Sequence, residues 1–335
     1  DPVSIENIEK NIVEVAFDKG WIKAYKPETR TGKTVAVIGS GPSGLAAAQQ
    51  LNRAGHLVTF YERDYKVGGL LRYGIPDFKL EKKIIDRRIE ILQEEGIIFK
   101  TNTNVGVDVC IETLKLDFDA MLLCGGAAAK RTLQIKGAEL KGVVQAMDFL
   151  KLNNEYVDGL KDFKNIISAK GKNVIVIGGG DTGSDCIGTS NRHGASSVTN
   201  FEILNKPSNG RPANQPWPFW PMKMKESSSH QEGVERFWSI STKEFLGDEN
   251  GNLTALITCE VEWVFEKGER PKLRELPGTD KTWPCELVLL ALGFTGPGST
   301  IIEKLGVETD FRTNVKATTK DFKTNIPGIF ACLLY

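Results

Sequence analysis

Residues 34–44 read TVAVIGSGPSG, and this stretch decides how the first half of the chain folds. Its first five residues are apolar or β-branched and predict a buried strand over 34–38, while a helical pattern opens at Gly44 and Gly55 ends it. Gly39, Gly41 and Gly44 have the spacing G-x-G-x-x-G between them. The first glycine allows a tight turn, the second lets the backbone approach a pyrophosphate, and the third lets the helix pack on the strand.

An acidic residue follows the next strand at the distance that this turn requires. The strand predicted over 57–61 leads directly into Glu62, 23 residues after Gly39. A carboxylate at that position accepts hydrogen bonds from the ribose hydroxyls of an adenosine. Strand, turn, helix and acidic residue together predict a dinucleotide site.

The same pattern returns at residues 174–183, which read VIVIGGGDTG. A strand over 174–177 leads into Gly178, Gly180 and Gly183, and the next strand brings Glu202 to the ribose position, 24 residues after Gly178. A carboxylate there repels the 2′-phosphate of NADP, so we expect NADH to be preferred to NADPH. The nearby Lys206 and Arg211 remain alternative contacts for a phosphate.

Two strand–helix–strand units of one layout, about 140 residues apart, predict an α/β chain with two Rossmann-like dinucleotide-binding domains. The economical reason for two sites is a resident flavin at one and a diffusing nicotinamide at the other. The fingerprints alone leave open which turn takes which dinucleotide.

The remaining segments are assigned by pattern. We expect amphipathic helices over 4–19 and 80–95 and irregular structure over the proline- and tryptophan-rich stretch 206–221. Residues 253–266 and 271–290 have the pattern of antiparallel strands joined by a charged turn.

Composition is that of an ordinary globular protein. The 335 residues hold 43 basic and 43 acidic side chains, so no bulk field favours nucleic acid or an anionic membrane as a partner. We find no signal segment and no membrane-spanning run, so a soluble protein is expected, and its compartment, cytoplasm or organelle matrix, stays open. The sequence begins with Asp1 rather than methionine, as expected of a processed product or a part of a longer chain.

The cysteines and histidines indicate no metal or redox centre. None of the six cysteines forms C-x-x-C, which argues against a redox dithiol, a zinc site or an iron–sulfur cluster in this sequence. We expect Cys124 and Cys186 to be buried structural thiols. The three histidines lack ligand spacing, and His56 and His193 stand beside helix-ending glycines, where a cation is favourable.

Two further stretches carry a family resemblance. Residues 68–76, GGLLRYGIP, and residues 178–188, GGGDTGSDCIG, resemble the flavin-side and nicotinamide-side signatures of the small subunit of glutamate synthase. NFEIL at 200–204 and LGFTGP at 292–297 look more like the NADH-dependent eukaryotic enzymes than the bacterial NADPH form. The resemblance covers nearly the whole chain.

This resemblance implies FAD at the first turn, NAD(H) at the second, and hydride transfer from NADH to FAD. It implies onward electron transfer through iron–sulfur clusters to FMN, both in regions absent here, and an amidotransferase and FMN-binding large region as partner. The residues that would surround FAD are Gly39, Gly41, Pro42, Ser43, Gly44, Glu62, Arg63, Gly69, Leu70, Arg72 and Ile75. Those that would hold NAD(H) are Gly178, Gly180, Asp181, Thr182, Gly183 and Glu202, and Gly293 and Phe294 would lie on a strand returning to the flavin domain.

The implied domains are discontinuous. Residues 1–30 would form a helix and linker, 31–135 with 291–335 the FAD domain, and 136–290 the NAD(H) domain. The family pattern continues after GIFAC with Gly-Asp and a helix facing the flavin, whereas Leu333, Leu334 and Tyr335 follow here, so the FAD domain is expected to be incomplete at its C-terminal end. Gly125 also replaces the threonine usual in the family.

Two other readings stay open. One is a related NAD(P)H-dependent flavoprotein subunit that feeds a ferredoxin or another reductase. The other is a nucleotide-binding scaffold without catalytic activity. Because hydride transfer needs positioned rings rather than a side-chain acid or base, no catalytic residue is predicted.

Overall fold

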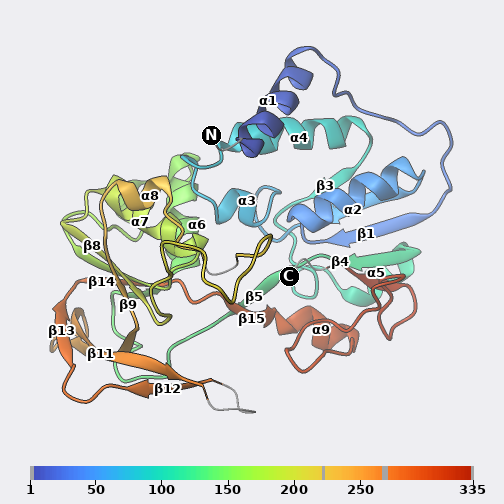
Figure 1. Ribbon diagram of the computed structural model, residues 1–335. Coiled ribbons are helices and arrows are strands. Elements are labelled where there is room, and N and C mark those ends of the chain that lie inside the picture. Colours follow the sequence, from blue (N-terminus) through green and yellow to red (C-terminus); the bar gives the residue numbers. More distant parts are fainter. Residues whose placement is uncertain (1–3, 221–222, 266–270, 333–335) are drawn as a thin grey trace. The chain divides into compact units, whose positions relative to one another are not determined.

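A computed structural model describes residues 4–220, 223–265 and 271–332 (Figure 1). The chain divides into two compact units. The first comprises Asp1–Leu71, Lys82–Ala128 and Gly296–Tyr335, and the second comprises Arg72–Glu81 and Ala129–Thr295. The second unit therefore includes the short segment 72–81, which the sequence analysis placed with the flavin domain.

The first unit is built on a five-stranded parallel sheet in the order β16-β4-β1-β2-β3. Its strands are β1 (Thr34–Ile38), β2 (Leu57–Tyr61), β3 (Ile98–Lys100), β4 (Ala120–Leu123) and β16 (Ile329–Ala331). The helices are α1 (Ile5–Asp18), α2 (Pro42–Arg53), α3 (Leu70–Tyr73), α4 (Lys82–Glu94), α5 (Ile111–Asp117) and α9 (Ser299–Leu305), of which α3 straddles the boundary. Four of the five residues of β1 are buried, as expected of a central parallel strand covered on both faces.

The second unit repeats this plan. Its parallel sheet has the order β6-β14-β7-β8-β9, so the strand before the second glycine turn again lies in the middle. These strands are β6 (Val143–Gln145), β7 (Asn173–Ile177), β8 (Ser197–Glu202), β9 (Glu235–Trp238) and β14 (Leu287–Leu290). The helices are α6 (Ala146–Val157), the 3-10 turn η1 (Phe163–Asn165), α7 (Asp181–His193) and α8 (Ser228–Gln231).

An antiparallel sheet completes the second unit. Its central strand β11 (Leu253–Val264) pairs with β10 (Ile240–Gly247), β12 (Lys272–Glu275) and β13 (Lys281–Pro284). Two short strands, β5 (Ala127–Lys130) and β15 (Phe294–Pro297), pair where the chain passes from one unit to the other.

The predicted fold class is confirmed, and the elements around both turns differ from the expected bounds by only a few residues. Helix α2 begins at Pro42, two residues earlier than expected, because proline suits the first helical position. The prediction for 271–290 was wrong in part: its last strand, β14, joins the parallel sheet. The charged turn at 266–270 and the ending at 333–335 lie outside the described residues.

The proline- and tryptophan-rich stretch agrees with its prediction, whereas the N-terminal helix differs from the usual amphipathic helix. Residues 206–220 contain no helix or strand, as expected, and Trp217 is 82% exposed. The helix over 5–18 is present, yet its apolar face stays exposed: Ile8 is 51% and Ile12 is 63% exposed. Helix α1 is instead attached through Glu14, which forms two hydrogen bonds with Arg87 of α4 at 2.7 and 2.5 Å.

His193 is held inside the second unit at the end of α7. Its Nδ1 accepts a hydrogen bond from the amide of Ala169 (3.3 Å), so Nε2 carries the proton and donates to Asn153 Oδ1 (2.9 Å). Burial lowers the pKa of His193 below the ordinary 6.5. The expected structural role fits this geometry, but a cation that complements the helix dipole does not, since the ring is neutral at pH 7.

This burial predicts that the second unit loses stability in mild acid. The unfolded histidine binds a proton near pH 6.5 while the folded one does not, so the contribution is complete above that pH and is lost as the pH falls toward the lower folded pKa. The urea midpoint should drop between about pH 7.5 and about pH 5.5, and less so in His193→Gln. His230, whose pKa burial also lowers, should retain part of the dependence. An unchanged pH dependence in the variant would contradict the assignment.

Candidate dinucleotide-binding turns

The first glycine turn is a close backbone crossing that admits no side chain at two of its positions. Gly39 has φ +99°, and a Cβ there would lie 2.5 Å from the carbonyl oxygen of Cys124, just after β4. A Cβ on Gly44 would lie 2.2 Å from the carbonyl oxygen of Gly39. Both contacts are far shorter than van der Waals separation, so the close packing of strand, turn and helix requires glycine at these two positions.

Gly41 differs from its neighbours because a Cβ there meets no described atom within 4 Å. It is the N-cap of α2 and is extended, with φ −67° and ψ −179°. The fold therefore does not need glycine at this position, whereas a ligand that approaches the helix N-terminus does. Pro42 and Ser43, two of the residues predicted to surround FAD, form the first turn of α2.

Gly68 and Gly69, which begin the flavin-side stretch 68–76, lie against this turn. Gly68 and Gly69 both have positive φ, and a Cβ on Gly69 would lie 2.8 Å from the Cα of Gly41. The amide of Gly68 donates to Ser40 Oγ at 3.0 Å. Residues 68–69 thus line the same turn as the first fingerprint, which the family resemblance implied.

Glu62 is buried at the end of β2 and faces the turn. Its Oε2 accepts hydrogen bonds from the amide (3.1 Å) and the hydroxyl (2.5 Å) of Ser40, and its Oε1 accepts from the amide of Asp64 (2.9 Å). Ser40 was not among the predicted residues, although its place inside the fingerprint was a signal. Arg63, in contrast, has a side chain that is 61% exposed.

The second turn has the same geometry in the second unit. Gly178 has φ +118°, and a Cβ there would lie 2.3 Å from the carbonyl oxygen of Ala291, just after β14. A Cβ on Gly183 would lie 2.2 Å from the carbonyl oxygen of Gly178, while a Cβ on Gly180 meets no described atom within 4 Å. Asp181 and Thr182 form the first turn of α7. In each unit the first and third glycines are closed, meaning that the fold leaves no room for a Cβ there. The second glycine is open, meaning that a Cβ would meet no described atom within 4 Å.

Glu202 lies directly over this turn. An ideal Cβ on Gly179 would lie 1.9 Å from Glu202 Cδ, so the carboxylate occupies the space above that glycine. Arg236 of β9 holds it: Arg236 Nη2 lies 3.1 Å from Glu202 Oε1, and the two side chains are 12% and 16% exposed. Sequence reasoning missed Arg236 because it is 34 residues away along the chain.

The two cations named beside Glu202 contact other groups, although the ring that Lys206 contacts is also a neighbour of Arg236. The Lys206 Nζ lies 4.8 Å from the centroid of the Trp238 ring. Arg211 donates to the backbone oxygens of Gln215 (3.2 Å) and Phe219 (2.6 Å), so it folds its own loop.

Asn200 is a third residue of the turns that was not predicted from the sequence. It is fully buried on β8, and its Nδ2 donates to the carbonyl oxygens of Val176 and Gly178, each at 3.0 Å. This side chain holds the backbone of residues 176–178, just before the open glycine. In the sequence, its position two residues before Glu202 was the one indication of this role.

The predicted flavin residues 70–75 extend into the segment grouped with the second unit. Leu70 is 50% exposed, and Arg72 is 2% exposed. Asn154 of α6 donates to the carbonyl oxygens of Arg72 (3.1 Å) and Ile75 (3.0 Å). Gly293, with φ +76°, accepts from the amide of Arg131 at 3.2 Å, and Phe294 begins β15.

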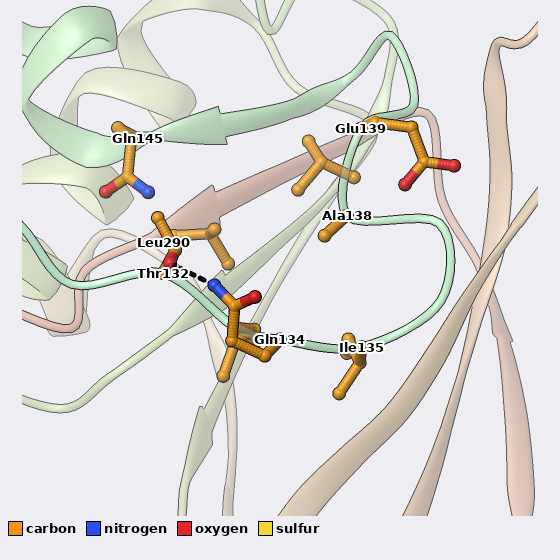
Figure 2. A pocket seen from close by; sticks show the side chains of 9 residues that line it. Thr132, Gln134, Ile135, Ala138, Glu139, Gln145 and Leu290 are labelled. Carbon is orange, nitrogen blue, oxygen red and sulfur yellow. Dashed lines mark hydrogen bonds between the residues drawn. The ribbon is translucent and has the colours of Figure 1, made fainter.

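A hollow of about 510 Å³ lies in the second unit, between residues 132–139 and the strands β6 and β14 (Figure 2). Figure 2 shows Gln134 hydrogen-bonded to Thr132, at 2.9 Å. The predicted site residues do not line it. The hollow is therefore not part of either glycine turn.

The cysteines of the described residues include the two thiols that were predicted to be buried. Burial raises the pKa of Cys124 to about 12 and raises that of Cys186 as well, in keeping with buried structural thiols. Within residues 4–220, 223–265 and 271–332, no group of three or more His, Cys, Asp or Glu side chains could hold a metal ion. In the same part of the chain we find no helix with the length and apolar character needed to cross a membrane.

Comparison with known proteins identifies the family. The model of the pyridine nucleotide-disulphide oxidoreductase family matches residues 33–332. The glutamate synthase [NADPH] small chain of Mycobacterium tuberculosis is 48% identical over 98% of this chain and 67% of its own length. The corresponding protein of Bacillus subtilis is 46% identical over 99% and 69%. The glutamate synthase [NADH] of Schizosaccharomyces pombe is 45% identical over 98% of this chain but only 16% of its own length.

Solved structures agree on the fold. FprA from Mycobacterium tuberculosis in complex with NADPH has a TM-score of 0.69 at 18% identity, covering 90% of this chain and 78% of that one. A thioredoxin reductase of Lactococcus lactis has a TM-score of 0.57 at 19% identity, covering 89% of each chain. The NADPH and NADH relatives are about equally similar, so the comparisons give no preference between the two coenzymes.

The resemblance found in the sequence is thus confirmed: the chain belongs to the pyridine nucleotide-disulphide oxidoreductases, in the group formed by the glutamate synthase small chains and the matching region of the NADH-dependent enzymes.

Proposed function

We propose that this chain is the electron-input module of a glutamate synthase, with FAD at the turn 39–44 and a nicotinamide dinucleotide at the turn 178–183. The observation that carries the proposal is the repeated turn, closed at its first and third glycines and open at its second, Gly41 in one unit and Gly180 in the other. The closed glycines are required by the packing of strand and helix. An open glycine at a helix N-terminus instead lets the backbone approach a bound pyrophosphate.

The residues of the first turn fit FAD. Gly41 leaves room for a pyrophosphate at the N-terminus of α2, and the buried Glu62 places a carboxylate at the end of β2, where an adenosine ribose would lie. Ser40 keeps that carboxylate in place through two hydrogen bonds. When bound, FAD would accept a hydride and release electrons one at a time.

The residues of the second turn fit a dinucleotide that binds and leaves. Gly180 and the start of α7 would take the pyrophosphate, and Asn200 holds the backbone before it through the carbonyl oxygens of Val176 and Gly178. Glu202 supports the preference for NADH, because its carboxylate lies at the ribose position. The partner in this proposal is the large chain of glutamate synthase, whose FMN would receive the electrons by way of iron–sulfur clusters.

An anaerobic visible spectrum of the chain reconstituted with FAD tests this function. Addition of NADH should bleach a protein-bound flavin band, and Gly180→Ala should need far more NADH while keeping its flavin. A chain that folds but retains no flavin would overturn the proposal in favour of a nucleotide-binding scaffold. Rapid reduction of a ferredoxin without any large chain would favour the related reductases.

A further inference from the structure

The coenzyme preference of the second turn depends on a residue outside the fingerprint. Arg236 and Glu202 lie on neighbouring parallel strands, where Asn200 pairs with Arg236 and Glu202 pairs with Trp238. Paired residues of parallel strands point to the same side of a sheet, so these four side chains share the face at which the ribose would lie.

Arg236 is held firmly on this face. Its Nη2 contacts Glu202 Oε1 at 3.1 Å, its Nη1 donates to the carbonyl oxygen of Lys225 at 3.1 Å, and its guanidinium lies 4.9 Å from the centroid of the Trp238 ring. The side chain is 12% exposed, and its Nε is buried without a hydrogen-bond partner among the described residues. One cation is therefore fixed beside the carboxylate that recognises the ribose.

This pairing gives Arg236 two effects of opposite sign. It orients Glu202 over Gly179, so that the carboxylate is ready to accept the ribose hydroxyls of NADH. It also places at the same point a planar cation that binds phosphate well. As long as Glu202 is ionised and paired, it competes with a phosphate for that cation and repels it.

We propose that Arg236 is the specificity-determining partner of Glu202: paired, the two side chains select NADH, and without the Glu202 carboxylate Arg236 binds the 2′-phosphate of NADPH. This inference rests on the proposed nicotinamide site at the turn 178–183. It predicts that the change from one coenzyme to the other requires the loss of one charge at Glu202 and the presence of Arg236.

Binding of two half-molecules to the chain loaded with FAD tests the inference without turnover, because FAD fills the first turn and leaves the second to the half-molecules. Calorimetry with 5′-AMP and with 2′,5′-ADP measures the contribution of the 2′-phosphate alone. The native chain should prefer 5′-AMP. Glu202→Gln should raise the affinity for 2′,5′-ADP relative to 5′-AMP by about tenfold or more, the effect of a single strong charge contact. Glu202→Gln combined with Arg236→Met should lose this gain.

Matched variants separate a specific role from a general one. Glu232→Gln and Arg192→Met break another Arg–Glu pair of the same unit, which includes a hydrogen bond at 2.9 Å, and should leave the ratio of affinities unchanged. If the Arg236→Met variant does not fold, Arg236→Lys in the Glu202→Gln background keeps the charge without the planar fork and should retain only part of the gain.

The outcomes are distinct. A gain that persists without Arg236, or a native chain that prefers 2′,5′-ADP, would overturn the inference. Failure of every form to bind either half-molecule would instead overturn the nicotinamide site on which it rests.

Discussion

Gly178→Ala is expected to lower the free energy of unfolding of the second unit by about 3 kcal/mol or more. Two costs add. The new Cβ would lie 2.3 Å from the carbonyl oxygen of Ala291, and forced overpacking costs about 1–3 kcal/mol. The residue also has φ +118°, a backbone conformation that costs an L-residue about 1–3 kcal/mol. Urea unfolding followed by tryptophan fluorescence measures the effect, because five of the six tryptophans (Trp217, Trp220, Trp238, Trp263 and Trp283) lie in this unit.

Gly180→Ala is the matched control, two residues away in the same turn. Its Cβ meets no described atom within 4 Å, and its backbone, with φ −78°, suits any residue. The urea midpoint should therefore stay close to that of the native chain, while the affinity for the nicotinamide dinucleotide falls. Equal loss of stability in both variants would contradict the distinction between closed and open glycines. A Gly180→Ala chain that binds NADH normally would contradict the site.

The sequence was sufficient to predict both turns because their requirements are local. A strand, three glycines, a helix and an acidic residue lie within 25 residues or so of one another, and each has a physical role that its residue type reveals. The same locality explains why the bounds of β1, α2, β7 and α7 were predicted closely. Strand β14 was assigned to the wrong sheet because its partners, β6 and β7, are more than 100 residues away along the chain.

The supporting residues of the sites were missed for the same reason. Arg236 meets Glu202 only because β9 lies beside β8, and Asn154 reaches the carbonyls of Arg72 and Ile75 across about 80 residues of sequence. A polar residue in such a place has no signature of its own, since arginines and asparagines are common on any surface. Fingerprints thus predict the two turns, whereas the residues that pack against these turns depend on tertiary pairing.

The second large effect is expected at Glu95, just beyond the end of α4. This side chain is fully buried, and its Oε1 accepts hydrogen bonds from Arg53 Nη2 (2.7 Å), Gln49 Nε2 (3.3 Å) and the amide of Tyr25 (3.2 Å). One carboxylate therefore connects the N-terminal linker, α2 and α4. A buried acceptor with three donors is costly to remove, because all three donors lose their partner and the Gln49 amide among them is buried away from water.

Glu95→Ala should lower the free energy of unfolding of the first unit by about 2–3 kcal/mol, because the buried Gln49 amide loses this acceptor, while Arg53, whose side chain is 36% exposed, regains water. Glu95→Gln keeps the shape and one acceptor oxygen, so it should lose less. Glu94→Ala is the matched control: the neighbouring carboxylate is exposed, and its removal should change stability by no more than about 0.5 kcal/mol. Amide hydrogen exchange of α2 and α4 measures the change in this unit directly. If Glu95→Ala exchanged no faster than Glu94→Ala, the linker would be held by its other contacts, such as the hydrogen bond from Arg30 Nη1 to Asn52 Oδ1 at 2.8 Å.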